Sequence, residues 1–156
     1  MTHEAAAPLT QTETSDLEEL AADAPRVGII MGSKSDMDEM QKAGDVLAEN
    51  GVDYEIRVMS AHRDPDVVAD YCHNARMRGL RVLIAGAGLS AALPGVAAAH
   101  TDLPVIGVPL TSRMSAAGGL DAILSIAQMP PGVPVACVGL DNPRNAAHLA
   151  VRILGI

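Results

Sequence analysis

Short apolar runs alternate with longer segments of helical periodicity along most of this chain. Five runs rich in Val, Ile and Leu are expected to form buried parallel strands, at residues 26–31, 53–59, 81–85, 104–108 and 134–138. Helices are expected to follow them over residues 35–50, 64–79, 91–100, 119–128 and 143–154. Strands and helices that alternate with short connections predict a doubly wound parallel sheet covered on both faces, a three-layer α/β/α sandwich.

The amino-acid composition agrees with such a fold. Hydrophobic residues make up 49% of the chain, yet there is no Phe, no Trp and only two Tyr. The core must therefore consist of Ala, Val, Ile, Leu and Met, whose modest size lets helices approach a parallel sheet closely. A length of 156 residues suits one domain with its own core, and we expect residues 26–156 to form a single α/β domain.

Acidic residues are concentrated at the N-terminus. Residues 1–25 hold six Asp or Glu and no Lys or Arg, whereas the rest of the chain holds 13 acids against 11 bases. The first segment has no run of β-branched apolar residues, so we expect a disordered acidic arm over residues 1–25. The remainder is close to electrical balance and has neither a basic stripe nor an aromatic platform, which argues against nucleic acid as a partner.

The sequence also limits where the protein acts and which groups it uses. The chain opens without a signal-peptide pattern, and no apolar run reaches the ~18–20 residues of a membrane-spanning helix. Cys72 and Cys137 are isolated and match neither a disulfide framework nor a zinc motif. No two histidines have the i, i+4 spacing of a helical metal site. We therefore expect a cytoplasmic protein with inert thiols, no metal and no membrane partner.

The segment after the first expected strand has features of an anion site. Ligands of open parallel sheets bind beyond the carboxyl ends of the strands, and here Gly32-Ser33-Lys34-Ser35-Asp36 occupies that position. A glycine turn and two hydroxyls precede a helix whose free N–H groups attract an anion such as phosphate. The segment is neither a Walker loop nor a G-x-G-x-x-G motif. The alternative is ordinary helix capping by Ser35 or Asp36.

The segment after the second expected strand, Ser60-Ala61-His62-Arg63, is more specific. His62 is the only histidine at a strand end, and an imidazole that titrates near neutrality can move a proton. Arg63 can hold a phosphate or carboxylate through two parallel hydrogen bonds. The alternative is a polar turn in which Ser60 and Asp64 cap the next helix. After the third strand, Gly86-Ala87-Gly88 offers backbone to a flat ring, or forms a tight turn.

These segments resemble a known family. The stretches that carry the likeness are VGIIMGSKSD (27–36), MSAHRDP (59–65), IAGAG (84–88), ALPG (92–95), VIGVP (105–109), LDAILSIAQMPPG (120–132) and NAAHLAVRIL (145–154). They resemble N5-carboxyaminoimidazole ribonucleotide mutases, within the aminoimidazole ribonucleotide (AIR) carboxylase superfamily. The motif GSKSD followed by SAHR is specific, and the likeness covers residues 26–156. It implies a flavodoxin- or Rossmann-like fold for the catalytic domain.

The resemblance also implies an activity. Members of the family move a carboxylate from the exocyclic amine of an aminoimidazole ribonucleotide to ring carbon four, a step of purine synthesis, by releasing and recapturing CO2. They use no metal or organic cofactor and form homo-octamers whose sites are shared between subunits. The resemblance implies that His62 is the catalytic acid and base. The substrate-binding residues implied by it are Gly32, Ser33, Ser35, Asp36, Ser60, Ala61, Arg63, Gly86, Ala87, Gly88 and Leu93.

Several positions depart from the usual family pattern and leave other functions open. Ala92 stands where a histidine is usual, Asp64 replaces a threonine, and the stretches 88–91 and 140–142 also differ. One alternative is a direct AIR carboxylase, which takes free CO2 and usually has lysine where this chain has Arg63, so Arg63 favours the mutase. The others are a paralogue acting on another heteroaromatic carboxylate, and a non-catalytic nucleotide-binding module that has no need of His62.

Overall fold

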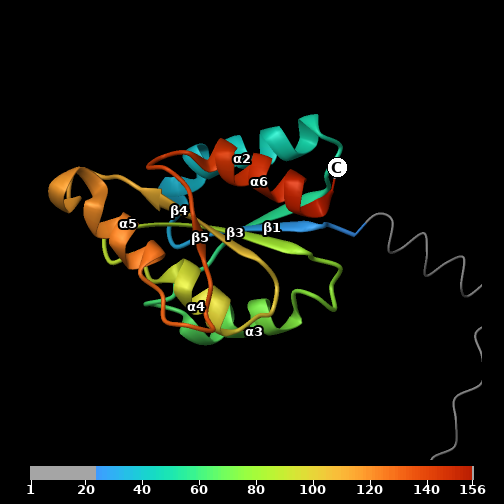
Figure 1. Cartoon of the computed structure of the whole chain (residues 1–156), viewed down its shortest axis with the longest axis horizontal. Helices are drawn as coiled ribbons and strands as arrows, with labels where there is room; N and C mark the ends of the chain where they lie inside the picture. The colour runs from blue at the N-terminus through green and yellow to red at the C-terminus, as the bar shows by residue number, and fades with distance from the viewer. Residues whose placement is uncertain (1–23, 156) are drawn as a thin grey trace, which may run out of the picture.

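Residues 24–155 are described by a computed structural model, in which a parallel sheet lies between two layers of helices (Figure 1). The strands are β1 (Val27–Met31), β2 (Tyr54–Val58), β3 (Val82–Gly88), β4 (Val105–Leu110) and β5 (Ala136–Cys137). The α-helices are α2 (Met37–Glu49), α3 (Pro65–Asn74), α4 (Leu93–Ala99), α5 (Leu120–Ala127) and α6 (Pro143–Leu154). Two 3₁₀ helices, η1 (Lys34–Asp36) and η2 (Ala116–Gly119), precede α2 and α5.

Each face of the sheet has its own hydrophobic core. On one face, α2 and α6 pack side chains such as Met40, Leu47 and Val151 against Ile29, Ile84 and Ile106 of the strands. On the other face, α3, α4 and α5 contribute residues that include Val68, Ala97 and Ile126. Figure 1 shows α2 and α6 above the sheet and α3 and α4 below it. The predicted three-layer α/β/α sandwich is confirmed.

The order of the strands determines where a ligand can bind. The sheet runs β2-β1-β3-β4-β5, and all its ladders are parallel. From β1 the chain moves outward to β2 and then crosses back to β3 on the other side of β1. This order is the flavodoxin-like one, whose switch point between β1 and β3 opens a crevice at the carboxyl ends of the strands.

Strands β3 and β4 extend further than the sequence indicated. The prediction that Gly86-Ala87-Gly88 forms a loop is wrong, because these residues continue β3 and pair with Val108, Pro109 and Leu110 of β4. Close packing explains their small size. A Cβ on Gly86 would lie 2.4 Å from the sulfur of Met40, and one on Gly88 would lie 2.8 Å from the carbonyl oxygen of Leu110.

Several predicted boundaries also shift. Helix α3 ends at Asn74 rather than residue 79, since the N–H of Ala75 already bonds the carbonyl of Cys72 and a turn follows to Gly79. Helix α5 begins only after the left-handed residues Gly118 and Gly119. Strand β5 has two paired residues instead of five. The expected disordered arm, residues 1–25, lies outside the described residues apart from its last two.

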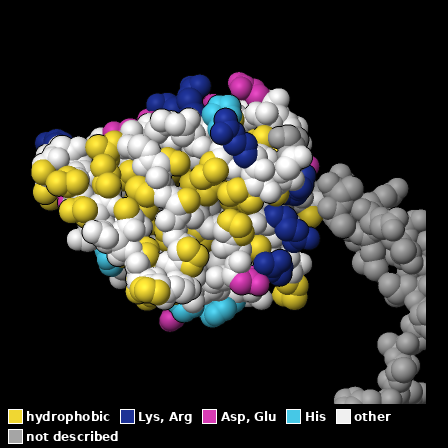
Figure 2. Space-filling model, viewed as in Figure 1, with side chains coloured by type: hydrophobic (Ala, Val, Ile, Leu, Met, Phe, Trp, Pro, Cys, Tyr) yellow, Lys and Arg dark blue, Asp and Glu magenta, His cyan; other side chains and the backbone are white. Residues whose placement is uncertain are grey.

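One region of the surface is notably apolar. Figure 2 shows hydrophobic side chains gathered over the end of the molecule that carries α5. Leu120 and Leu124 of this helix are 46% and 48% exposed, and Met114 in the preceding loop is 74% exposed. Within residues 24–155, no helix has the length and apolar character needed to cross a bilayer.

Candidate active site

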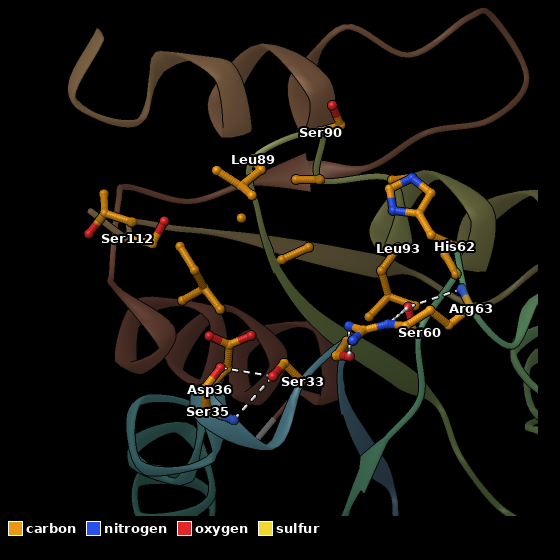
Figure 3. Close-up of a pocket in the computed structure, with 18 residues that line it drawn as sticks. Ser33, Ser35, Asp36, Ser60, His62, Arg63, Leu89, Ser90, Leu93 and Ser112 are labelled. Carbon is orange, nitrogen blue, oxygen red and sulfur yellow. Dashed lines mark hydrogen bonds between the residues drawn. The ribbon is translucent and has the colours of Figure 1, made fainter. Parts of the chain in front are cut away.

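A pocket of about 470 Å³ lies at the carboxyl ends of β1, β3 and β4 (Figure 3). Its volume falls in the usual range for small-molecule sites. The segments after β1 and β2 supply a polar wall, and the end of β3 and the start of α4 supply a largely apolar wall. The switch point of the sheet therefore holds a cavity with two chemically distinct sides.

The loop after β1 forms the base of the polar wall. Ser33 is extended, with φ −146° and ψ 146°, and its hydroxyl accepts a hydrogen bond from the N–H of Ser35 at 3.2 Å. The two serine hydroxyls lie 2.8 Å apart. Helix η1 starts here and continues directly into the 13-residue α2. The positive end of this helix and the two hydroxyls together suit an anionic group such as phosphate.

Arg63 ties the loop after β2 to the loop after β1. Its guanidinium donates hydrogen bonds to the carbonyl oxygen of Gly32 at 2.9 Å and to the hydroxyl of Ser60 at 3.2 Å. The same hydroxyl, which is buried, also accepts from the backbone N–H of Arg63 at 3.2 Å. Two of the five guanidinium N–H groups are used in this way. The others have no hydrogen-bond partner among residues 24–155, so they could bind an anion beside Ser33.

His62 and Arg63 project in opposite directions from one turn. In Figure 3 the guanidinium of Arg63 points toward the loop of Ser33, whereas the imidazole of His62 points away from that loop, on the side of Ser90. His62 is exposed in the pocket, and no protein hydrogen bond to its ring is present within residues 24–155. The imidazole is thus open to a ligand at the apolar wall, while Arg63 faces the polar wall.

The apolar wall consists of small residues and leucines. Its members, all of which line the pocket, are Ala61, Ala87, Ala91, Ala92, Leu93 and Leu110. Most of them are buried, and Leu89 holds a left-handed φ of 55° that turns the chain out of β3 toward α4. A flat, weakly polar ring fits against such a wall better than a charged group does.

Asp36 is the carboxylate of the pocket. Partial burial raises its pKa, and the nearby negative charge of Asp141 raises it further. Asp141 itself lies outside the pocket lining, where it binds the pocket residue Thr111. Burial and Asp141 therefore both disfavour the charged form of Asp36. Hydrogen bonds donated by a ligand, such as those from ribose hydroxyls, would stabilise that charged form.

The thiols lie apart from this pocket. Burial raises the pKa of Cys72 to about 11 and also raises the pKa of Cys137. Thiols with raised pKa values are poor nucleophiles at neutral pH, in agreement with the expectation of inert cysteines.

Eleven of the twelve site residues named from the sequence line this one pocket, and their contacts with a substrate stay predictions. The exception is Gly86, which lies within β3 against Met40. The pocket residues that sequence reasoning did not place in the site are Leu89, Ser90, Ala91, Ala92, Leu110, Thr111 and Ser112. Leu110 is the last residue of β4, and the others follow β3 or β4 at the carboxyl edge of the sheet.

The fold and the pocket define an open-sheet α/β protein with a cavity of small-molecule size at its topological switch point. Residues 26–156 match the family described as AIR carboxylase, and the chain belongs to this family. It is 56% identical over 132 residues to the N5-carboxyaminoimidazole ribonucleotide mutase of Thermotoga maritima, which covers 85% of this chain and 76% of that protein.

Two further relatives show the range of the family. The phosphoribosylaminoimidazole carboxylase of Schizosaccharomyces pombe is 54% identical over 132 residues, which span 85% of this chain but 24% of that protein. The crystal structure of Treponema denticola PurE superposes with a TM-score of 0.72 at 35% identity, covering 84% of this chain and 80% of that one. The similarity therefore extends across the described domain and includes its pocket.

Proposed function

We propose that this protein is an N5-carboxyaminoimidazole ribonucleotide mutase of de novo purine synthesis. It converts N5-carboxyaminoimidazole ribonucleotide to 4-carboxy-5-aminoimidazole ribonucleotide. The observation that carries the proposal is the 56% identity to a mutase of that name over almost the whole domain, pocket segments included. The two-sided pocket supports it, because the substrate joins an anionic ribose phosphate to a flat aromatic ring.

The polar wall suits the ribose phosphate. Its phosphate would lie between the Ser33–Ser35 hydroxyl pair, the start of α2 and the free N–H groups of Arg63. Asp36, one turn further along, would accept hydrogen bonds from the ribose hydroxyls. Binding of the phosphate at this wall would fix the position of the ring, so that the reacting atoms are held in a defined geometry.

The apolar wall suits the chemistry of the ring. The bond between N5 and its carboxyl carbon breaks, its electron pair stays on nitrogen, and CO2 remains against the alanines and Leu93. Ring carbon four then attacks CO2 and loses its proton to restore the aromatic ring. A wall of this kind disfavours water and keeps CO2 near carbon four.

His62 would carry both protons. It donates one to the amine nitrogen as CO2 leaves and accepts one from ring carbon four after the new C–C bond forms, so the imidazole returns to its starting state. A histidine suits both steps, since its ordinary pKa lies near neutrality. The exposure of the ring at the apolar wall supports this role.

The main rival is a direct AIR carboxylase, which the name of the Schizosaccharomyces pombe relative suggests. The two reactions differ in substrate, so an assay separates them. The protein is given either N5-carboxyaminoimidazole ribonucleotide alone or AIR with bicarbonate, and the absorbance of the carbon-four carboxylated product is followed. The mutase proposal requires fast product from the first substrate. Efficient product formation only from AIR with bicarbonate would establish the carboxylase. No product from either substrate would indicate a paralogue or a binding module.

We also propose that the protein works in the cytoplasm as a homo-octamer. The exposed side chains of Met114, Leu120 and Leu124 form an apolar surface that a partner subunit would cover. In such an assembly a neighbouring copy would complete the site. Light scattering tests the assembly, and a monomeric species with full activity would contradict it.

A further inference from the structure

A second cavity lies at the opposite end of the sheet from the candidate active site. It has a volume of about 400 Å³ and its lining includes four arginines, Arg26, Arg76, Arg78 and Arg81. Arg26 precedes β1 and Arg81 precedes β3, and the N–H of Arg81 donates to the carbonyl of Arg26 at 2.8 Å. This arginine hollow is therefore built at the amino ends of the two central strands. Figure 2 shows Lys and Arg side chains gathered on this end of the molecule.

The charges of the arginine hollow are only partly balanced. Arg78 donates to both carboxylate oxygens of Glu55, at 2.6 and 2.7 Å, and Arg76 pairs with the exposed Asp102 at 3.0 Å. Arg81 donates instead to the backbone carbonyl of Leu80. Within residues 24–155, no carboxylate forms an ion pair with Arg26 or Arg81. No carboxylate of the described domain therefore neutralises the guanidinium charges of Arg26 and Arg81.

The N-terminal segment joins the fold at this hollow. Ala24 lines it, and packs on Gly79, where an added Cβ would lie 2.9 Å from the Cβ of Ala24. The left-handed φ of Gly79, +99°, also favours glycine there. The 23 residues before Ala24 contain six acidic side chains and no Lys or Arg, and Asp23 is adjacent in sequence. An acidic segment therefore begins at the rim of a basic cavity.

We propose that residues 1–23 bind the arginine hollow of their own subunit through their carboxylates. Arginine binds carboxylates through paired hydrogen bonds, and a short tether gives the segment an effective concentration in the millimolar range. The attraction between exposed charges is screened by salt, so the contact is reversible.

Proteolysis of the full-length chain tests this contact. A glutamyl endopeptidase cuts after Glu4, Glu13, Glu18 and Glu19 in the segment, and mass spectrometry follows the cuts at low ionic strength. If the segment is bound, the Arg26→Gln/Arg81→Gln variant is cut at least about fivefold faster than the native chain. Equal rates for the two proteins would overturn the proposal.

Matched variants separate charge from folding. Arg26→Lys/Arg81→Lys keeps both charges and should retain most of the protection, while Arg144→Gln, at the start of α6 at the other end of the sheet, should be cut like the native chain. In about 1 M NaCl, where the Debye length is ~3 Å, the difference between the native chain and the double Gln variant should vanish. A difference that persists in high salt, or that appears equally in the lysine variant, would contradict an electrostatic contact.

An added anion supplies an independent measurement. Inorganic tripolyphosphate should compete for the arginine hollow and accelerate cleavage of the native chain, with no effect on the double Gln variant. Acceleration of both proteins to the same extent would count against the hollow as the binding site.

Discussion

Asp141 accepts two hydrogen bonds from Thr111, one from its backbone N–H at 2.8 Å and one from its hydroxyl. Asp141 has a left-handed φ of 50°, and its own N–H donates to the carbonyl of Pro109 at 2.9 Å. The loop after β5 is thereby fastened to the end of β4, beside the pocket. The charge of Asp141 also contributes to the raised pKa of Asp36, although burial contributes more.

We predict that Asp141→Asn weakens substrate binding and shifts its pH dependence. Loss of one strong hydrogen bond to Thr111 should raise KM by about two- to tenfold, with a smaller effect on kcat. Removing the negative charge lowers the pKa of Asp36, so the acid-side loss of binding should move to lower pH. Thr111→Val is the control, because it removes the hydroxyl but keeps the charge of Asp141. An unshifted pH profile of KM in Asp141→Asn would rule out this coupling.

Arg63 should act mainly in binding. Its bonds to Gly32 and Ser60 hold the guanidinium beside the Ser33–Ser35 loop. Arg63→Gln should therefore raise KM at least about tenfold, which is the effect of losing a charge-assisted hydrogen bond. The KM of Arg63→Lys should lie between those of the native protein and Arg63→Gln. Steady-state kinetics with Arg144→Gln as a control measure this. A fall in kcat at unchanged KM would instead place Arg63 in the chemical step.

Glu55 should stabilise the amino end of the sheet in a pH-dependent way. Burial alone would raise its pKa, but hydrogen bonds from Arg78, Tyr71 and Arg57 outweigh burial and lower the pKa. A lowered pKa gives stability that is present above the ordinary value of 4.5 and is lost as pH falls through the folded-state value. Thermal unfolding should show Glu55→Gln less stable by about 1 kcal/mol at neutral pH.

That difference should disappear in acid, where Glu55 is protonated in the native protein as well. Glu49→Gln is the matched control, since Glu49 is exposed at the end of α2 and forms no ion pair within residues 24–155. A stability loss of equal size at neutral and acid pH would show that Glu55 acts through packing rather than charge.

Gly107 in β4 should tolerate no side chain. A Cβ at this position would lie 2.3 Å from Cγ2 of Ile126 and 3.1 Å from Cγ1 of Val135. Because both neighbours are stiff and β-branched, Gly107→Ala should lower the free energy of unfolding by about 1–3 kcal/mol. Gly139→Ala is the control, since its nearest neighbour is Asn142 Cβ at 4.0 Å. Equal unfolding temperatures for the two variants would refute this reading of the packing.

The sequence was sufficient for the layers of the fold and for most of the pocket. Apolar runs mark buried strands, and the segments after β1 and β2 carry their own local signals, such as the capping hydroxyl of Ser33. Parallel order then brings those segments together, because successive strands of a doubly wound sheet end at the same edge. The residues of the polar wall could therefore be predicted from the sequence.

Pairing between residues far apart in the chain could not be predicted from local sequence patterns. Glycine, alanine and proline have little intrinsic preference for strands, so nothing in Gly86-Ala87-Gly88 indicated that β4 would extend β3 to Gly88. The bond between Thr111 and Asp141 joins residues 30 positions apart, and its partners follow different strands. Thr111 and Ser112 follow Leu110, the last residue of β4, and both line the pocket.

The most direct test of the proposed active site compares catalysis and binding in His62→Asn. If His62 moves both protons, kcat should fall at least about 100-fold, while calorimetry should find the affinity for 4-carboxy-5-aminoimidazole ribonucleotide within a few-fold of the native value, because the polar wall is intact. Unchanged turnover in His62→Asn would contradict the assignment of the acid and base, and with it the mechanism proposed for this pocket.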